Sequence, residues 1–338
     1  MEALSEFGVF FGKVLVLFLF FAGLALFIVV LSMRAKHKPQ FEVENLNEKF
    51  DDIKSSLKEV MLNKKQLKAL AKNEKAEKAK KEKDETETAK AFYLTFEGDL
   101  TASQSKELRD EISAVLQVAK PGDEVVVSVE SPGGTVNGYG LAAAELIRVR
   151  DAGLKLIVCV DKIAASGGYM MACTAHRIYS APFAVVGSIG VIAQIPNVHK
   201  LLKKHNVDYE EVTSGEYKKT VSIFGEITEK GRAKFQEQIQ DTHVLFKSWV
   251  HTYRPQLNVE KVGTGEYWFG MRAIELNLVD EIKTSDQYLE EKMATHTVYK
   301  VRFMPKKSFS EKISEAMSFS IAKAANTIAD RFIQKTIL

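Results

Sequence analysis

The chain has 338 residues, of which 46% are hydrophobic and 27% charged, so it can bury an ample core in one large or two modest domains. Its two cysteines, Cys159 and Cys173, are too few for a disulfide framework in a chain of this length. They also lack the spacing of a metal site, and no cluster of His, Cys, Asp and Glu in the sequence indicates one. We therefore expect two small buried thiols and no metal site.

An unbroken apolar run covers residues 14–31. This is roughly the length that a helix needs to cross about 30 Å of hydrocarbon, so we predict a transmembrane helix within an N-terminal anchor of residues 1–38. A cleaved signal peptide is the alternative, but the run is too long for its apolar region and no small-x-small cleavage site follows. The chain is therefore expected to stay in a lipid bilayer with a single span.

Basic residues around this span bear on its orientation. Only Lys13 precedes the run closely, whereas Arg34, Lys36 and Lys38 follow it. Because cytoplasmic flanks carry the excess of lysine and arginine, this count favours a cytoplasmic location for the bulk of the protein.

Residues 39–90 have the composition of a charged linker or an exposed helix, and residues 62–83 are especially rich in lysine. We interpret the lysine-rich part as a solvated spacer, with attraction to anionic lipid headgroups as the alternative. No aromatic residues interleave with the lysines, which argues against nucleic acid as a partner. Spaced apolar positions in residues 41–70 are compatible with a weakly amphipathic helix.

A globular domain is predicted for residues 91–305. Its first part alternates strands, at 92–96, 124–129 and 155–160, with helices at 103–118 and 137–150. Such repeated strand-helix-strand units argue for a mainly parallel sheet covered by helices.

The second part of this domain begins with an apolar stretch at residues 183–198. It is short and contains two glycines and a proline, so we predict buried strands and turns there rather than a second membrane span. A long helix is predicted at 228–253, capped by Thr228 and closed before Pro255.

Three further elements complete the chain. A helix at 285–295 and a strand at 298–304 end the domain. Residues 306–338 are predicted as a C-terminal amphipathic helix, because apolar side chains recur there at helical spacing. This helix has three possible docking sites: the domain, a sister subunit or the membrane surface.

Two glycine-rich turns follow predicted strands, at residues 130–135 and 164–168. The carboxyl ends of parallel strands are where α/β proteins build their sites. Glycines leave backbone N–H groups free to face a developing oxyanion, and Ser166 lies near a helix N-terminus, where negative charge is favoured. Neither a Walker pattern nor a Gly-x-Gly-x-x-Gly pattern is present, so a phosphate cradle is not indicated.

A serine nucleophile needs a base to take its proton. None of the seven histidines is placed beside Ser166, and the nearest, His176, is interpreted as a solvated structural residue that opens an edge strand. A lysine whose pKa is lowered by burial can serve instead. The candidates are Lys218 and its neighbour Lys219, of which only one can point inward from an extended segment.

Five motifs occur in a characteristic order between Phe92 and Asp280. They are Ser131-Pro132-Gly133-Gly134, Ala164-Ala165-Ser166-Gly167-Gly168-Tyr169, Val186-Gly187-Ser188-Ile189-Gly190-Val191, Ser214-Gly215-Glu216-Tyr217-Lys218, and Trp268-x-Gly270-x-x-Ala273 with Leu278-Val279-Asp280. On these motifs the chain resembles the signal peptide peptidase A (SppA) group of membrane serine proteases and, within it, the SohB-like inner-membrane peptidases.

The resemblance implies an α/β fold of the ClpP/crotonase type, a spiral of strand-strand-helix repeats. It implies a Ser/Lys dyad in which Ser166 is the nucleophile, Lys218 the general base and Ser188 the group that orients the lysine. The backbone amides of Gly134 and Gly167 would form the oxyanion hole. No metal, nucleotide or organic cofactor is then needed.

The resemblance also bears on substrates, partners and location. Members of the group hydrolyse hydrophobic or signal-peptide-like peptides, and misfolded membrane or envelope proteins are a further substrate class for this chain. They form homo-oligomers whose neighbouring protomers can complete each site. Their catalytic domains mostly lie in the periplasm, contrary to the charge count, so the side of the inner membrane stays open.

Two other functions are compatible with such a fold. One is an acyl-CoA hydratase or hydrolase, although a membrane anchor and a Ser/Lys pair are not expected in it. The other is a catalytically inactive membrane scaffold, although a scaffold has no reason to retain Ser166, Ser188, Lys218 and both glycine turns together.

Overall fold

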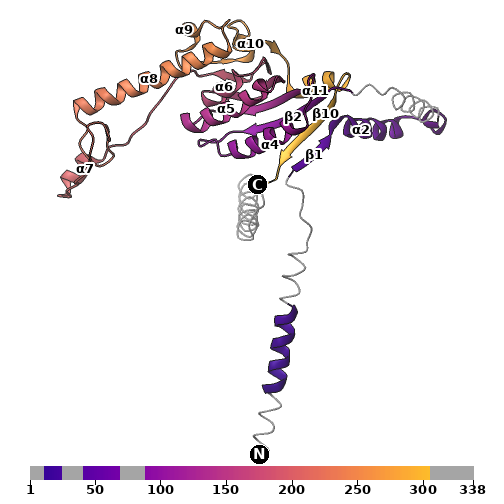
Figure 1. Ribbon diagram of the computed structural model, residues 1–338, viewed down its shortest axis with the longest axis horizontal. Coiled ribbons are helices and arrows are strands. Elements are labelled where there is room, and N and C mark those ends of the chain that lie inside the picture. The colour runs from indigo at the N-terminus through magenta and orange to yellow at the C-terminus, as the bar shows by residue number, and fades with distance from the viewer. Residues whose placement is uncertain (1–10, 25–40, 69–87, 305–338) are drawn as a thin grey trace, which may run out of the picture. The chain divides into compact units, whose positions relative to one another are not determined.

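The computed structural model of the protein describes residues 11–24, 41–68 and 88–304 (Figure 1). The chain divides into two units, Met1–Gln40 and Phe41–Leu338. In the first unit, residues 11–24 are helical. Among the described residues, no helix has both the length and the apolar character needed to cross a membrane.

Several sequence predictions extend beyond these ranges. The predicted span continues past residue 24, most of the lysine-rich run follows residue 68, and the C-terminal helix lies after residue 304. These parts of the predictions lie outside the described residues.

The second unit is a mixed α/β structure. Its strands are β1 (Phe41–Asn45), β2 (Lys90–Glu97), β3 (Glu124–Glu130), β4 (Lys155–Val160), β5 (Ile163–Ala165), β6 (Arg177–Ser180), β7 (Val185–Gly187), β8 (Tyr267–Phe269), β9 (Glu281–Ile282) and β10 (Thr297–Phe303). Its helices are α2 (Leu46–Met61), α4 (Ser105–Val118), α5 (Val136–Asp151), α6 (Gly167–Ala172), α7 (His199–Lys204), α8 (Glu229–Tyr253), α9 (Val259–Val262), α10 (Gly270–Ala273) and α11 (Ser285–Met293).

The strands form two sheets. The larger has seven strands in the order β1-β10-β2-β3-β4-β6-β9, and every neighbouring pair is parallel except β1 with β10. The smaller has the order β5-β7-β8, with β5 parallel to β7 and β8 antiparallel to it. From β4 to β7 the chain alternates between the sheets, because β4 and β6 lie in the large one while β5 and β7 lie in the small one. The prediction of a mainly parallel sheet is confirmed.

Alternate residues of the large sheet enter two separate cores, as a pleated strand requires. Val125 and Val127 of β3 pack in the larger core, together with residues of α4, α5 and α6. Val126, between them, packs in the smaller core with residues of α2 and α11. Helices therefore cover both faces, which explains why the central strands are almost entirely apolar.

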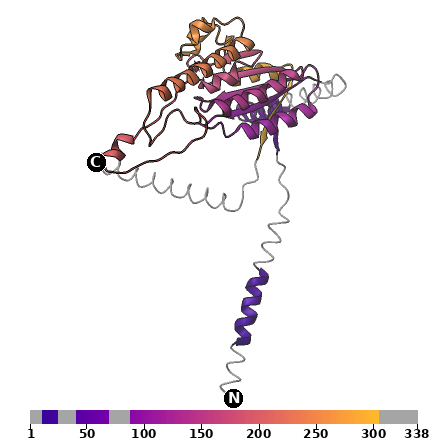
Figure 2. The same cartoon turned by 60° about the vertical axis from the view of Figure 1, so that its left-hand side comes forward.

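Residues 191–228, which we call the arm, contain α7 but otherwise no regular helix or strand. Figures 1 and 2 both show α7 and the loops beside it away from the sheets, toward the N-terminal end of α8. Helix α8 is capped by Thr228, whose side chain accepts a hydrogen bond from the backbone N–H of Gly231. It ends before Pro255, as predicted, and its 25 residues give a length of about 37 Å.

The structure differs from the sequence predictions at β1. Residues 39–90 were predicted as a charged linker or an exposed helix, and α2 agrees with the helix expected within residues 41–70, but β1, which pairs with β10, was not predicted. Asn45 caps α2, and the side-chain amide of Asn47 donates to the carbonyl oxygens of Met293 and His296. The pattern was missed because the strand is short and charged, and because its partner lies about 250 residues further along the chain.

A second difference concerns β6, which follows His176. It pairs with β4 on one side and β9 on the other, so it is not an edge strand. The Nδ1 atom of His176 accepts a hydrogen bond from the backbone N–H of Leu156 at 2.9 Å, which is a structural role. Both cysteines are free and buried, as expected.

Candidate functional site

Ser166 occupies a strained turn between β5 and α6. It is the N-cap of α6, with φ 52° and ψ −116°, a conformation that residues other than glycine rarely adopt. Its backbone N–H donates to the carbonyl oxygen of Gly187 at 2.8 Å, and its own carbonyl accepts from Met170. The turn therefore holds the serine at the carboxyl end of a strand by backbone bonds on both sides.

The glycine loop after β3 lies directly against this turn. Gly133 has φ 91°, and a Cβ atom built on it would come within 2.7 Å of both the Ser166 Cβ and the Gly167 nitrogen. A Cβ on Gly134 would collide with the carbonyl oxygen of Leu100, and one on Gly167 would collide with the ring of Tyr139. Glycine is required at these positions because neighbouring backbone, and at Gly167 the Tyr139 ring, leaves no room for a side chain.

Buried hydroxyl groups fix the glycine loop. Ser131 Oγ lies 2.5 Å from the Tyr139 hydroxyl and accepts from the backbone N–H of Gly133 at 3.0 Å. The Tyr139 hydroxyl in turn donates to the carbonyl oxygen of Asp99 at 2.7 Å. An isolated parallel bridge between Ser131 and Ala164 joins the two glycine-rich turns.

The turns also carry backbone donors without protein partners. Among the described residues, neither the N–H of Gly134 nor that of Gly167 donates to a protein acceptor. Gly167 is the first residue of α6, where the helix itself offers no acceptor. Such donors at a helix N-terminus can stabilise a negatively charged oxygen.

Ser166, Gly134 and Gly167 line one small hollow of about 60 Å³, which we call the serine hollow. Its other lining residues are Val136, Met170, Gly190, Val191, Ile192, Thr242 and Phe246. The wall is therefore mostly apolar and comes from α5, α6, α8 and the start of the arm.

Ser188 occupies the position next to Ser166 on the neighbouring strand. Ala165 and Gly187 are partners in the parallel pairing of β5 with β7, so the two serines follow paired residues. Both serines have φ 52°. The backbone N–H of Ser188 donates to the carbonyl oxygen of Glu266 at 2.7 Å. The structure thus brings together four of the five residues singled out from the sequence: Ser166, Ser188, Gly134 and Gly167.

Lys218 is the fifth, and within one chain it does not join them. It is exposed on the arm, and it does not line the serine hollow. Its neighbours Glu216 and Tyr217 contact Lys230 of α8, by an ion pair and by the aromatic ring respectively. Lys230 precedes Thr242 of the serine hollow by twelve residues, a rise of about 18 Å along the helix.

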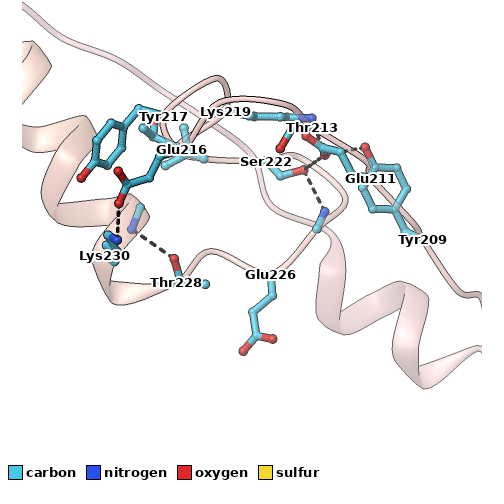
Figure 3. Close-up of a pocket in the computed structure, with 14 residues that line it drawn as sticks. Tyr209, Glu211, Thr213, Glu216, Tyr217, Lys219, Ser222, Glu226, Thr228 and Lys230 are labelled. Atoms are coloured by element: carbon cyan, nitrogen blue, oxygen red, sulfur yellow. Dashed lines mark hydrogen bonds and ion pairs between the residues drawn. The ribbon is translucent and has the colours of Figure 1, made fainter.

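A larger hollow of about 360 Å³, the arm hollow, is lined by Tyr217 and Lys219, the two chain neighbours of Lys218 (Figure 3). Lys219, not Lys218, points into it and pairs with Glu211, with 2.6 Å between Lys219 Nζ and Glu211 Oε2. This hydrogen bond raises the pKa of the Lys219 ammonium above its ordinary value. The serine hollow and the arm hollow are thus lined by different residues.

Sequence reasoning overlooked one histidine near the site. His243 of α8 lies next to Thr242, and its Nε2 atom is 3.1 Å from the carbonyl oxygen of Ile189. No motif marks it, and only the packing of α8 against the segment after Ser188 brings it there. In the part of the chain that the structure describes, no three His, Cys, Asp or Glu residues are grouped as a metal site.

Known proteins resemble the chain in structure and in sequence. The 1510-N membrane-bound stomatin-specific protease, solved as a mutant, superposes with a TM-score of 0.42 and 14% identity over 61% of this chain and 85% of its own. The probable protease SohB of Haemophilus influenzae is 48% identical over 92% of both chains. The probable protease SohB of Buchnera aphidicola subsp. Schizaphis graminum is 43% identical over the full length of both.

Family models cover nearly the whole chain. Residues 148–299 match the model of peptidase family S49, and residues 2–146 match that of the peptidase family S49 N-terminal region. The chain belongs to peptidase family S49. Its resemblance to the SppA group and to the SohB-like peptidases is thereby confirmed.

Proposed function

We propose that the protein is a membrane-anchored serine endopeptidase in which Ser166 attacks the substrate carbonyl and Lys218 acts as general base. The observation that carries this proposal is the arrangement at Ser166. One hollow contains a strained serine and two backbone N–H groups without protein partners among the described residues, and the glycine loop contacts the serine. This is the set of groups that acyl transfer by a serine requires. The chain also belongs to a peptidase family.

The reaction proceeds in two halves. Neutral Lys218 takes the proton of the Ser166 hydroxyl as its oxygen attacks the scissile carbonyl, and the N–H groups of Gly134 and Gly167 stabilise the oxyanion. Lys218 then gives this proton to the leaving amine, and an acyl-serine remains. Water attacks the ester with Lys218 again as base, and Ser166 recovers its proton as the acid product leaves.

Lys218 is the better candidate base of the two adjacent lysines. Lys219 pairs with Glu211, which keeps its amine protonated, whereas among the described residues Lys218 Nζ has no hydrogen bond or ion pair. In a buried site a lysine without an acidic partner can lose its proton near neutral pH.

A second copy of the chain supplies Lys218 to each site in this proposal. The arm carries the lysine away from the serine of its own chain, and a general base must come within about 3 Å of the hydroxyl. An arm that reaches the serine hollow of a neighbour makes a head-to-tail contact, and such contacts form a ring when the rotation between copies closes. Ser188, directly after the strand that pairs with β5, would then receive the incoming amine through its hydroxyl.

The remaining features agree with a peptidase of membrane-associated peptides. The apolar serine hollow suits hydrophobic segments, and the apolar run at residues 14–31 would anchor the enzyme in the inner membrane of a bacterium. The alternation of β4, β5, β6 and β7 between two sheets supports a ClpP/crotonase type of spiral.

One experiment in two steps tests whether Ser166 and Lys218 are catalytic and whether they come from one chain or from two. Cleavage of casein or a hydrophobic peptide is measured for the detergent-solubilised full chain, for Ser166→Ala and for Lys218→Ala. Each substitution should lower the rate at least about 1000-fold. Equal rates in all three would exclude this dyad, and a wild type without activity would indicate a scaffold.

The two inactive chains are then co-expressed. If the base comes from a neighbour, a Lys218→Ala chain next to a Ser166→Ala chain rebuilds an intact site, and about a quarter of the activity returns in a random ring. A dyad within one chain would give no recovery, because neither chain carries both groups.

A further inference from the structure

The residues on both sides of Lys218 have side-chain partners, whereas among the described residues Lys218 Nζ has none. On its N-terminal side, Glu216 pairs with Lys230, and the Tyr217 ring lies under the ammonium groups of Lys230 and Lys234, at 5.9 and 5.1 Å from its centroid. On its C-terminal side, Lys219 pairs with Glu211. Lys218 is therefore flanked on both sides by residues that are held in place.

Glu211 is the centre of the contacts on the C-terminal side. Its Oε2 atom accepts hydrogen bonds from Lys219 Nζ at 2.6 Å, the Tyr209 hydroxyl at 2.8 Å and Ser222 Oγ at 3.3 Å, as Figure 3 shows. Ser222 Oγ also accepts from the backbone N–H of Gly225 at 2.9 Å. A single carboxylate thus joins the segment before Lys218 to the segment after it and closes the loop that carries the lysine.

These contacts restrict where Lys218 can point. Lys218 ends a turn, its side chain is exposed, and it does not line the arm hollow, whereas Lys219 does. Because Glu211 holds the Lys219 side chain in the arm hollow, the preceding residue is directed out of it, toward whatever surface the arm meets. The loop itself contributes only one backbone bond near this point, from the Lys218 N–H to the carbonyl oxygen of Gly215.

We propose that Glu211 is a positioning residue for catalysis: by binding Lys219, Tyr209 and Ser222 it aims Lys218 out of the arm hollow, so that this amine and not that of Lys219 enters the serine site. The inference rests on the proposed function. It adds a residue outside the five recognised motifs, and it explains how the protein uses one of two adjacent lysines.

The negative charge of Glu211 also favours Lys218 over Lys219 as the general base. The ion pair keeps the Lys219 amine protonated, since it raises the pKa of that group, and a protonated amine cannot take a proton from Ser166. The hydrogen bonds to Lys219 and Tyr209 also lower the pKa of the Glu211 carboxyl, so the pair persists as the pH falls below neutral.

Activity measurements on three variants test the role. In the full chain in detergent, Glu211→Gln and Lys219→Gln should each lower kcat about tenfold and change KM less than twofold, because the substrate hollow is untouched. The double variant should also lose about tenfold, since both changes break one interaction. Glu226→Gln serves as the matched control, because Glu226 lines the same hollow and has no hydrogen bond or ion pair among the described residues. It should keep wild-type kcat.

A multiplicative loss of about 100-fold in the double variant would overturn the proposal, since it would show two independent structural effects. Wild-type kcat in Glu211→Gln would overturn it as well. If wild-type cleavage proves independent of Lys218, the proposed function fails while the positioning of the lysine is still tested by the following measurement.

Competitive acetylation provides that measurement without any substrate. The full chain is treated with limiting acetic anhydride at neutral pH, and fragment mass spectra give the acetylation rates of Lys218 and Lys219. Lys218 should react several-fold faster in the wild type and in Glu226→Gln. In Glu211→Gln the two rates should approach each other. Equal rates in the wild type, or an unchanged ratio in Glu211→Gln, would refute the role of Glu211.

Discussion

The two halves of the proposed dyad lie in regions built in opposite ways. Ser166 belongs to a turn between a paired strand and a buried helix, with backbone hydrogen bonds to Gly187 and Met170 and with Gly133 packed against its Cβ. Lys218 belongs to an arm that contains one short helix and is held by hydrogen bonds and by two ion pairs whose side chains are 24–71% exposed. The nucleophile is thus prepared by the fold of one chain, whereas the base depends on where its arm docks.

The largest difference in stability between the two regions is expected when an ion pair is broken. Arg254 is only 2% exposed and binds Asp280 through two hydrogen bonds of 2.7 and 3.0 Å. Arg254→Met leaves the Asp280 carboxylate without its cation, so the free energy of unfolding should fall by about 3–5 kcal/mol. Urea unfolding followed by tryptophan fluorescence measures this loss. We call the described part of the second unit outside the arm the body. A loss below about 1 kcal/mol would show that the buried ion pair stabilises the body no more than the exposed ion pairs stabilise the arm.

Glycines with positive φ provide the second contrast. Gly133→Ala would bring a methyl group against Ser166, so kcat should fall about 100- to 1000-fold. In the arm, Gly215 has a similar φ, 98° compared with 91° at Gly133. The nearest atom to a Cβ built on Gly215 is the Lys218 Cβ, at 4.0 Å. The kcat of Gly215→Ala should fall less than about tenfold, because only the backbone preference is lost. Similar losses of kcat in the two variants would contradict the contrast.

The pH dependence of stability should also come from the body. Glu111 of α4 is 2% exposed, and burial raises its pKa to about 7. Because the folded chain binds this proton more tightly than the unfolded chain, the contribution of Glu111 to stability is highest below about pH 4.5 and falls as the pH rises to about 7. The loss should reach about 3 kcal/mol at most. Unfolding midpoints from pH 5 to 8 should show this slope in the wild type and a flatter profile in Glu111→Gln.

The smallest effect is expected for the arm. Lys230→Met removes the ion pair with Glu216, whose side chains are 71% and 58% exposed. The urea midpoint should change only slightly, and less still in high salt. Urea unfolding at two salt concentrations tests this. A shift as large as that of Arg254→Met would mean that the arm is as firmly built as the body.

Much of the fold follows from local signals in the sequence. The Thr228 cap and Pro255 set both ends of α8, and the alternation of apolar strands with helices fixed the parallel sheet. The sequence predicts that both glycine-rich turns follow strands, and the structure adds that a bridge between Ser131 and Ala164 joins them.

Other features depend on distant partners and left no local signal. The strand β1 is recognisable only beside β10, and the place of Lys218 is set by contacts of the arm with α8 rather than by its motif. The positive φ of Ser166 and Ser188 is imposed by paired strand ends, since serine has no preference for it. Roles that depend on tertiary contacts, such as those of Glu211 and His243, could not be derived from residue spacing.

The pairing of β1 with β10 has a mechanical consequence. The strands are antiparallel and Phe41 faces Phe303, so the chain enters and leaves the sheet at the same end. A force that separates these two points would open the hydrogen bonds one after another, as a zipper opens, and would not shear them together. The first bonds to yield lie beside the contact of the Phe303 N–H with Glu111, whereas the bonds of Asn47 to Met293 and His296 are at the closed end. Tension on the chain would thus detach β1 long before it disturbed the turn that holds Ser166.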